Sequence, residues 1–363
     1  MTSLLPRWRR HATAAAVAAA MALSALLGTS PAPARADAAP VAFTNGFGLT
    51  QVGTPEVHSS TDFTITVTTA QLAGTHKIRI FLPQGYAANP TERWPVAYFL
   101  HGGGGTVDDA AAAPALHSDA MITVVPDGGL KGWYADWAMQ NTALGAANWQ
   151  TFHTTQVVPF IDANLRTIAD RAHRAVLGLS MGGYGALHYA EARPDLFGHT
   201  ASLSGGIDFG MAEVRAAVLA TELNVTGAWC AVSTSSPAGT GRCTGYGPYV
   251  DSDAIFGSPY PVFNADHIWN ALNPADPANL ARLAGSDITL YSGNQLPIDH
   301  FTEIASGTVK TRLDQLGIPS RYVDYGNGSS LSPTCDGGHD YGCWSAAFAD
   351  YMPRLAASFA AAG

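Results

Sequence analysis

The sequence is short of basic residues and of cysteine, and both shortages argue against classes of function. Only 19 lysines and arginines stand against 28 aspartates and glutamates, so the formal net charge is −9 at pH 7. A surface of this sign argues against nucleic acid or an anionic membrane as partner. The chain has four cysteines and no C-x-x-C motif, which disfavours a metal site.

A second long hydrophobic run is also missing. The alanine-rich run over residues 14–27 follows three early arginines and precedes a small-x-small site at 34–36. This order is typical of a signal peptide, so we predict that residues 1–36 are cleaved near Ala36 and that the protein is secreted. The pair Arg9-Arg10 leaves twin-arginine export open beside general secretion. No later run approaches the roughly 18 residues that a membrane span needs, so no stable membrane insertion is expected.

The four cysteines fall into two close pairs. Cys230 stands near Cys243, and Cys335 stands near Cys343. In an exported chain this spacing predicts two local disulfides, although four cysteines allow three connectivities.

The rest of the chain has the pattern of one α/β domain over residues 61–363. Residues 37–60 show little periodicity and are expected to form an extended lead-in. The stretch 227–260 is rich in glycine, serine and proline and is predicted to be an irregular insertion over the active face. Alternating runs at 63–67 and 77–81 predict two antiparallel strands.

Short apolar runs then recur at helix-sized separations, which predicts a mostly parallel sheet with helices on both faces. Crossover helices are expected at 149–164 and 308–316. The predicted strands are 96–100, 121–125, 175–177, 201–203, 288–291 and 322–325.

The stretch Gly178-Leu179-Ser180-Met181-Gly182 indicates a serine nucleophile. It lies between a β-branched run and a glycine- and alanine-rich helix start. A sharp strand-to-helix turn exposes the serine hydroxyl and directs the first helical N–H groups to the same place. Small flanking residues are required, because strand and helix pass very close.

A glycine-rich loop, His101-Gly102-Gly103-Gly104-Gly105, directly follows the predicted strand at 96–100. Its backbone can approach a substrate and supply half of an oxyanion hole, and the N–H of Met181 supplies the other half. His101 and Gly104 are candidates for contact with substrate. A phosphate loop is disfavoured, because the lysine and Ser/Thr of a P-loop are missing.

His339 is the predicted base, because its glycine-rich loop follows the last strand and precedes the final helix. His188 lies two turns along the helix after Ser180, and His267 and His300 are expected at the surface or in packing.

The acid is expected after the strand at 288–291, where Asp299 and Glu303 stand four residues apart on one helical face. Asp287 precedes that strand and is expected at the wrong edge of the sheet. Asp340 adjoins the base and is expected to be solvated.

Together these segments resemble an esterase family that includes S-formylglutathione hydrolases, feruloyl-type esterases and actinobacterial mycolyltransferases. The resemblance spans about residues 60–355. It rests on Leu100-His101-Gly102-Gly103, Trp133-Tyr134-Ala135-Asp136-Trp137, Gly178-Leu179-Ser180-Met181-Gly182-Gly183, and Gly338-His339-Asp340-Tyr341 with Trp344.

The resemblance implies an α/β-hydrolase fold, a Ser-Asp/Glu-His triad and no cofactor. It makes Ser180 the nucleophile, His339 the base, and Gly103 and Met181 the oxyanion donors. Asp299 fits the Asp-x-Phe of S-formylglutathione hydrolases, whereas Glu303 fits the glutamate of mycolyltransferases, so the acid stays open with Asp299 preferred.

The chain departs from the family pattern in two places. His101 stands where mycolyltransferases have an aspartate that is used in sugar binding, which argues against trehalose as acceptor. The approach to the histidine over residues 326–335 is longer than usual, and a disulfide there could hold the His339 loop.

From these observations we predict a secreted serine esterase that acts on a carboxylic ester through an acyl-enzyme. The alternatives are an acyltransferase that uses a sugar or glycerol hydroxyl, and a non-catalytic binding protein on the same fold.

Overall fold

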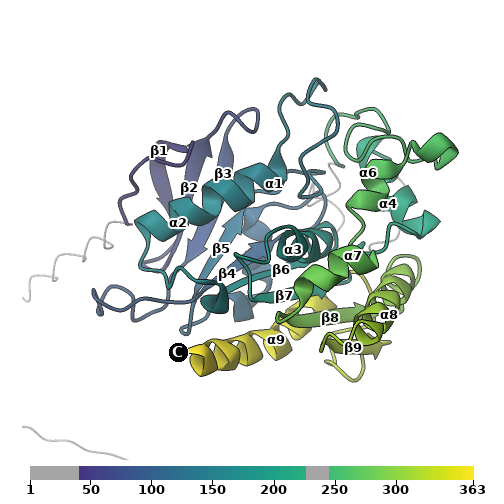
Figure 1. The fold of residues 1–363 in the computed structure, drawn as a ribbon. Coiled ribbons are helices and arrows are strands. Elements are labelled where there is room, and N and C mark those ends of the chain that lie inside the picture. The colour runs from purple at the N-terminus through teal and green to yellow at the C-terminus, as the bar shows by residue number, and fades with distance from the viewer. Residues whose placement is uncertain (1–40, 226–244) are drawn as a thin grey trace, which may run out of the picture. The chain divides into compact units, whose positions relative to one another are not determined.

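The nine-stranded sheet of this protein runs from β1 to β9 across Figure 1 in the order β1-β2-β3-β5-β4-β6-β7-β8-β9. The computed structural model describes residues 41–225 and 245–363. The predicted leader and the Cys230–Cys243 pair lie outside these residues. The strands are β1 (Thr50–Val57), β2 (Asp62–Thr68), β3 (His76–Phe81), β4 (Val96–Leu100), β5 (Ile122–Pro126), β6 (Arg174–Leu179), β7 (His199–Leu203), β8 (Asp287–Gly293) and β9 (Arg321–Gly326).

The first strands are antiparallel and the later ones parallel. β2 pairs with β3 in antiparallel register, with Ile65 opposite Ile78, and β3 pairs with β5 in the same sense. From β5 through β4, β6, β7 and β8 to β9, every neighbouring pair is parallel. The predicted mostly parallel sheet with two antiparallel strands at its start is therefore confirmed.

β1 was not predicted as a strand, because its sequence carries no apolar alternation. Its residues are exposed or half-buried throughout, so no face of the strand enters the core. Backbone pairing with β2 holds it as an edge strand, with a register shift between Val52 and Glu56. Hydrogen-bond pairing of this kind leaves little trace in hydrophobic periodicity.

Helices cover both faces of the sheet. They are α1 (Trp149–Thr151), α2 (Val158–Asn164), α3 (Met181–Ala192), α4 (Ala212–Glu222), α6 (His267–Ala271), α7 (Pro277–Leu280), α8 (Asp299–Gln315) and α9 (Tyr341–Ala362). The shorter elements are η1 (Val107–Ala112), η2 (Pro114–Leu116), η3 (Phe152–Val157), η4 (Arg171–His173), η5 (Val262–Asn264) and η6 (Ala281–Leu283).

Alternate residues of a single strand enter different cores. In β4, Tyr98 packs into the cluster that contains α3, whereas Phe99 packs into the cluster that contains α9. All five residues of β4 are buried, as expected for a strand covered on both faces. The predicted helix at 149–164 is present as α1, the π-helical η3 and α2. The helix predicted at 308–316 begins nine residues earlier, at Asp299.

The described part of the predicted insertion, residues 245–260, contains no helix or strand. It is nevertheless anchored in the main core, because Val250, Ile255 and Phe256 are buried there. Within the described ranges, no helix combines the length and apolar character needed to cross a bilayer.

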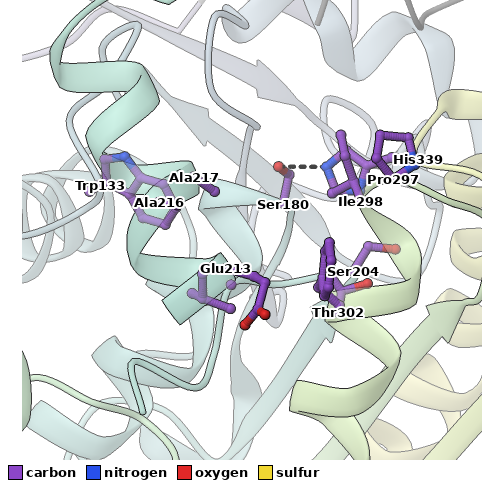
Figure 2. Close-up of a pocket in the computed structure, with 13 residues that line it drawn as sticks. Trp133, Ser180, Ser204, Glu213, Ala216, Ala217, Pro297, Ile298, Thr302 and His339 are labelled. Carbon is purple, nitrogen blue, oxygen red and sulfur yellow. Dashed lines mark hydrogen bonds between the residues drawn. The ribbon is translucent and has the colours of Figure 1, made fainter. Parts of the chain in front are cut away.

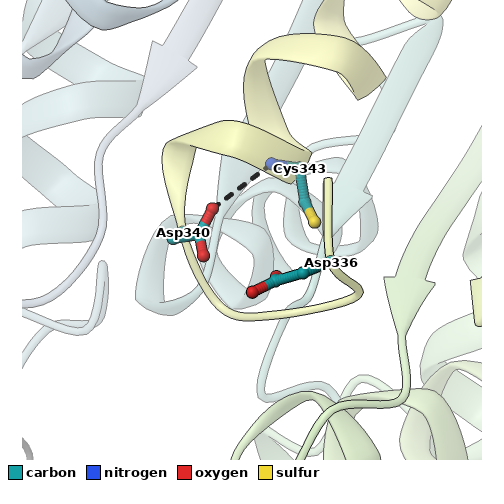
Figure 3. A group of neighbouring side chains, drawn as sticks. All are labelled: Asp336, Asp340 and Cys343. Atoms are coloured by element: carbon teal, nitrogen blue, oxygen red, sulfur yellow. Dashed lines mark hydrogen bonds between the residues drawn. The ribbon is translucent and has the colours of Figure 1, made fainter. Parts of the chain in front are cut away.

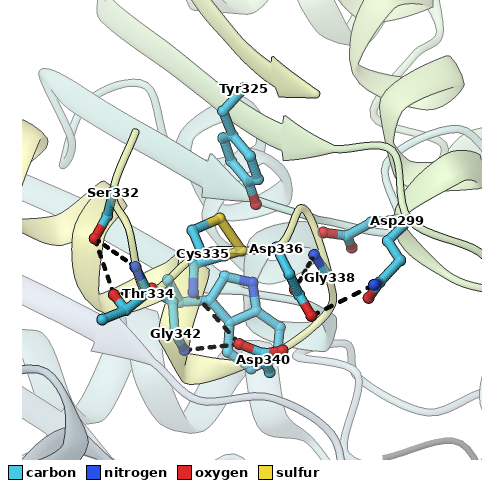
Figure 4. Close-up of a disulfide and its surroundings, with 12 residues drawn as sticks. Asp299, Tyr325, Ser332, Thr334, Cys335, Asp336, Gly338, Asp340 and Gly342 are labelled. Atoms are coloured by element: carbon cyan, nitrogen blue, oxygen red, sulfur yellow. Dashed lines mark hydrogen bonds between the residues drawn. A yellow bond between two sulfur atoms is a disulfide. The ribbon is translucent and has the colours of Figure 1, made fainter. Parts of the chain in front are cut away.

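The chain between β9 and α9 is tied by a disulfide between Cys335 and Cys343, as predicted (Figure 4). Asp340 caps the start of α9, where its side chain accepts from the N–H groups of Gly342 and Cys343. The bond and the cap together enclose His339.

Candidate active site

Ser180 occupies a strained turn between β6 and α3. Its backbone angles are φ 54° and ψ −120°, a combination that costs energy for any residue with a side chain. The turn needs glycine on both sides. A Cβ on Gly178 would lie 2.2 Å from the Gly182 carbonyl oxygen, and one on Gly182 would lie 2.0 Å from the Leu100 carbonyl oxygen. These contacts explain locally why the Gly-x-Ser-x-Gly spacing produces this conformation.

The imidazole of His339 faces the hydroxyl of Ser180 (Figure 2). Its Nε2 lies 2.8 Å from the Ser180 Oγ, within hydrogen-bond distance. The Trp344 ring contacts the imidazole edge to face, with centroids 4.8 Å apart. The histidine therefore sits in a position suited to take a proton from Ser180.

Asp299 contacts the other nitrogen of the same ring. Its Oδ1 lies 2.6 Å from the His339 Nδ1, and the residue is fully buried at the first position of α8. Ser180 follows β6, Asp299 follows β8 and His339 follows β9, so all three come from the carboxyl edge of the parallel strands, where such sheets place their ligands.

Glu303, the second candidate acid, lies one turn further along α8. Its carboxylate is 3.7 Å from the Nδ1 of His300 and makes no hydrogen bond to His339 within the described residues. Burial and the nearby Asp324 carboxylate raise the pKa of Glu303. The sequence left Asp299 and Glu303 both open, and in the structure only Asp299 contacts the imidazole.

Ser204, Tyr325 and Trp344 form a hydrogen-bonded group beside Asp299, and sequence reasoning gave none of them a role at the acid. Ser204, directly after β7, donates from Oγ to the Asp299 Oδ2 at 3.1 Å. The Trp344 Nε1 and the Tyr325 hydroxyl each lie 3.3 Å from the same Ser204 Oγ. Burial and the Asp299 charge raise the pKa of Tyr325 far above its usual value, so the phenol stays protonated. No motif marks Ser204; its position directly after a buried strand was the one available signal.

The predicted oxyanion donors, Gly103 and Met181, line the same hollow as Ser180. Met181 is the first residue of α3, where a backbone N–H has no partner within the helix. The N–H of Gly103 donates to no other residue in the described ranges. A Cβ on Gly103 would lie 3.1 Å from the Tyr246 ring, so glycine leaves room there for the described end of the insertion.

The structure contradicts the prediction that His101 contacts substrate. Its side chain is fully buried; Nδ1 lies 2.9 Å from the carbonyl oxygen of the adjacent Gly102, and Nε2 accepts from the N–H of Gly128. The misreading came from its place next to the glycines, which is adjacent in sequence but faces the interior. Gly104 does line the cleft, with φ 71° and its N–H donated to the Leu130 carbonyl.

Two hollows meet at Ser180. One, of about 300 Å³, is lined mainly by apolar side chains that include Val214, Ala217 and Phe301, and we call it the apolar hollow (Figure 2). The other, of about 600 Å³, runs along Gly102–Gly105 and reaches Thr106 and Asp108, and we call it the glycine cleft. Both hollows include Ser180 and His339 among their lining residues.

Trp133 lines both hollows and is held from two directions. Its Nε1 donates to the Thr221 Oγ1 at 2.9 Å, and its backbone N–H lies 3.3 Å from the Met181 sulfur. The φ of 46° at Trp133 is unusual for a residue with a bulky side chain. These two contacts fix the orientation of the indole, which lines both hollows.

The three other histidines weighed in the sequence bond to residues other than Ser180. His188 is buried on α3 and bonded to Gln150, and burial lowers its pKa to about 4. The Nδ1 of His267 contacts the Asn264 carbonyl, and His300 faces Glu303.

The two other acids weighed in the sequence have structural contacts. Asp287 begins β8 at the opposite end of the strand and accepts from His199 and Ser358. Asp340 caps α9, so it is engaged with backbone N–H groups.

Asp336, Asp340 and Cys343 form a close group of potential metal-binding side chains near His339 (Figure 3). Each of them has another bond. The Cys343 sulfur is in the disulfide, Asp340 caps α9, and Asp336 accepts from the N–H of Gly338. These bonds show that the three side chains hold the backbone of the loop around His339.

Comparison with known proteins identifies the family. Residues 69–355 match the model described as a putative esterase. The chain belongs to this esterase family. An esterase of Mycobacterium tuberculosis is 40% identical over 132 residues, which cover 35% of this chain and 28% of that protein. The diacylglycerol acyltransferase/mycolyltransferase Ag85B of Mycobacterium leprae is 23% identical over 245 residues and 66% of each chain.

Among solved structures, an S-formylglutathione hydrolase from Agrobacterium tumefaciens superposes with a TM-score of 0.57 at 13% identity, covering 88% of this chain and 99% of that one. This likeness and the sheet order confirm the predicted α/β-hydrolase fold. The chain spans about a quarter of the length of the M. tuberculosis esterase that it matches. The relatives named here include an esterase and an acyltransferase.

Proposed function

We propose that this protein is a secreted serine esterase that cleaves carboxylic esters through a covalent acyl-enzyme. The observation that carries the proposal is the continuous chain of contacts from Ser180 Oγ through both nitrogens of His339 to the buried Asp299. A hydroxyl becomes nucleophilic when a neighbouring base can take its proton and a carboxylate stabilises the resulting imidazolium. The matched family is consistent with this chemistry.

In the proposed reaction, His339 Nε2 takes the proton of Ser180 as Oγ attacks the ester carbonyl carbon. The carbonyl oxygen gains negative charge and accepts from the N–H groups of Gly103 and Met181. His339 then gives the proton to the departing alcohol, which leaves an acyl group on Ser180. Water, deprotonated by His339, releases the free acid and restores the serine.

The two hollows suggest how the substrate is divided. An acyl group fits the apolar hollow, since burial of its carbons against Val214, Ala217 and Phe301 is favourable. The alcohol part fits the glycine cleft, where Thr106 and Asp108 offer polar contacts. Trp133 stands between the two parts.

An acyltransferase is the second candidate function. The glycine cleft is about twice the volume of the apolar hollow, so it has room for a hydroxyl compound in place of water. The likeness to a mycolyltransferase supports this alternative. Mass spectrometry of products formed from a short ester in abundant glycerol or trehalose separates the two: free acid supports hydrolysis, and acylated polyol supports transfer.

Export is also part of the proposal. A disulfide at Cys335–Cys343 is of the kind that persists in oxidising compartments, and the predicted leader over residues 1–36 would deliver the chain there. N-terminal sequencing of protein recovered from culture medium tests this, and a chain that retains residue 1 inside the cell would contradict it.

The deciding experiment replaces Ser180 with alanine. We expect the S180A protein to fold and to lose on the order of 10⁴- to 10⁶-fold in kcat towards p-nitrophenyl esters. A fluorophosphonate probe should label the wild-type protein at Ser180 and leave S180A unlabelled. Retention of more than a few per cent of activity in purified S180A would refute the mechanism.

A further inference from the structure

The peptide group between Gly102 and Gly103 is held from its carbonyl side. The Gly102 carbonyl oxygen accepts from the N–H of Gly105 at 3.1 Å, and the Nδ1 of His101 lies 2.9 Å from the same oxygen. A trans peptide is planar, so its N–H points away from its C=O. Whatever fixes the Gly102 oxygen therefore also fixes the direction of the Gly103 N–H.

The contacts of His101 determine which ring nitrogen carries the proton. The backbone N–H of Gly128 donates to the His101 Nε2 at 2.8 Å, so Nε2 acts as acceptor. A neutral imidazole then has its hydrogen on Nδ1 and donates it to the Gly102 oxygen. The nearest carboxylate oxygen, on Asp127, is 3.8 Å from Nε2 and accepts from the Gly129 N–H instead.

The glycine loop needs such a restraint. Gly102–Gly105 are four consecutive residues without side chains, which leaves their peptide groups free to rotate. His101 is fully buried, so water has no access to replace its bond to Gly102. A rotation of the Gly102–Gly103 peptide would turn the Gly103 N–H away from Ser180.

We propose that His101 is a positioning residue for the oxyanion hole: its Nδ1–H clamps the Gly102 carbonyl and thereby aims the Gly103 N–H at the developing oxyanion. This inference rests on the proposed function of Ser180. It assigns to His101 a role without substrate contact. It also gives a physical reason why a loop of four glycines adopts the conformation seen in the structure.

Two substitutions separate the two bonds of the imidazole. His101→Asn places an amide NH₂ near the position of Nδ1 and keeps the donor to Gly102. His101→Gln reaches the position of Nε2 with an amide oxygen, which keeps the acceptor for Gly128 but removes the donor. The clamp depends on the first bond alone.

We expect H101Q to lose about 10- to 100-fold in kcat with KM changed less than about threefold, since complete loss of an oxyanion donor costs roughly 10²- to 10³-fold. H101N should stay within about threefold of the wild type in kcat. A trifluoromethyl ketone, whose hydrate-like adduct with Ser180 carries an oxyanion, should bind H101Q more weakly by the same factor as the loss in kcat/KM. A purely structural role would lower Tm in both variants without this split.

Tyr134→Phe is the matched control. The Tyr134 hydroxyl donates to the His101 carbonyl oxygen at 2.8 Å, a buried bond in the same loop that belongs to the preceding peptide group. Its loss should lower Tm and leave kcat within about threefold. A large fall in kcat for Y134F would show that any disturbance of the loop mimics the clamp, and would overturn the specific role of His101.

The position of the His101 proton can be measured on the wild-type protein without an activity assay. Nitrogen-15 NMR of labelled histidine, assigned with H101N, should find His101 neutral with its proton on Nδ1. A proton on Nε2 would overturn the clamp, even if H101Q fails to fold. Equal losses of kcat in H101Q and H101N, or full kcat in H101Q, would also overturn the clamp. If the wild-type protein hydrolyses no ester although His101 carries its proton on Nδ1, the proposed esterase function is refuted and the clamp is not.

Discussion

The two glycine-rich loops that flank Ser180 are fixed by different kinds of interaction. The loop His101–Gly105 lies against the interior, where its backbone is bonded to Leu130 and to the fully buried His101 and Tyr134. The loop around His339, in which Gly337 and Gly338 are buried and His339 is half-buried, is closed by the Cys335–Cys343 disulfide. Buried hydrogen bonds meet little competition from water, whereas a covalent link restrains a loop whether or not water reaches it.

The difference also sets what each loop can do. The loop His101–Gly105 presents the backbone N–H of Gly103, which needs only to keep a constant direction. The loop around His339 carries an imidazole that exchanges protons with substrate and water in the proposed reaction, and 15% of the His339 side chain is exposed. Its orientation then depends on Asp299 and on the groups that hold Asp299.

The largest effect on the His339 loop is expected from Asp299→Asn, which replaces the carboxylate that contacts the imidazole. The amide cannot stabilise the imidazolium, so we expect a loss of roughly 10³- to 10⁴-fold in kcat, with the fold preserved. Glu303→Gln on the same helix is the matched control and should cost less than about tenfold. Steady-state kinetics with p-nitrophenyl esters measures both. The reverse order would move the acid to Glu303.

A smaller effect on the same side is expected from Ser204→Ala. Removal of its hydroxyl takes one hydrogen bond from the Asp299 Oδ2, and a bond to a charged group contributes about 1.5 to 3 kcal/mol, so kcat should fall about 10- to 100-fold. Ser202→Ala is the control, because the buried Ser202 hydroxyl lies two residues earlier on β7 and has no hydrogen-bond partner among the described residues. Equal kcat in the two variants would remove Ser204 from the support of Asp299.

The disulfide should matter more for stability than for the reaction. Replacement of Cys335 and Cys343 by serine opens a short loop, and chain entropy predicts a loss of roughly 2 to 3 kcal/mol in the free energy of unfolding. We expect kcat to fall only a few-fold, because Asp299 still holds His339. Urea unfolding followed by fluorescence tests the first part. An unchanged urea midpoint and an unchanged slope of the unfolding free energy would mean that the hydrogen bonds of Asp336 and Asp340 suffice to hold the loop.

Much of the fold could be predicted because its signals are local. The runs at 96–100 and 288–291 are apolar except for Thr289, which is typical of strands buried on both faces. β1 gave no such mark, since its position depends on backbone pairing with β2. The start of α8 was misplaced because its first turn carries Asp299 and Thr302, buried polar residues that face the site and interrupt the apolar pattern.

The sequence by itself determined the elbow at Ser180 and the two glycine-rich loops, because the constraints act between residues a few positions apart: Gly178 and Gly182 leave room that no larger residue would. Only the tertiary structure brought Asp299, and not Glu303, into contact with His339. It also buried His101 and brought Ser204 to Asp299 from 95 positions away. These contacts depend on how β7, β8 and β9 lie side by side, and spacing along the chain carries no record of which side chains meet across parallel strands.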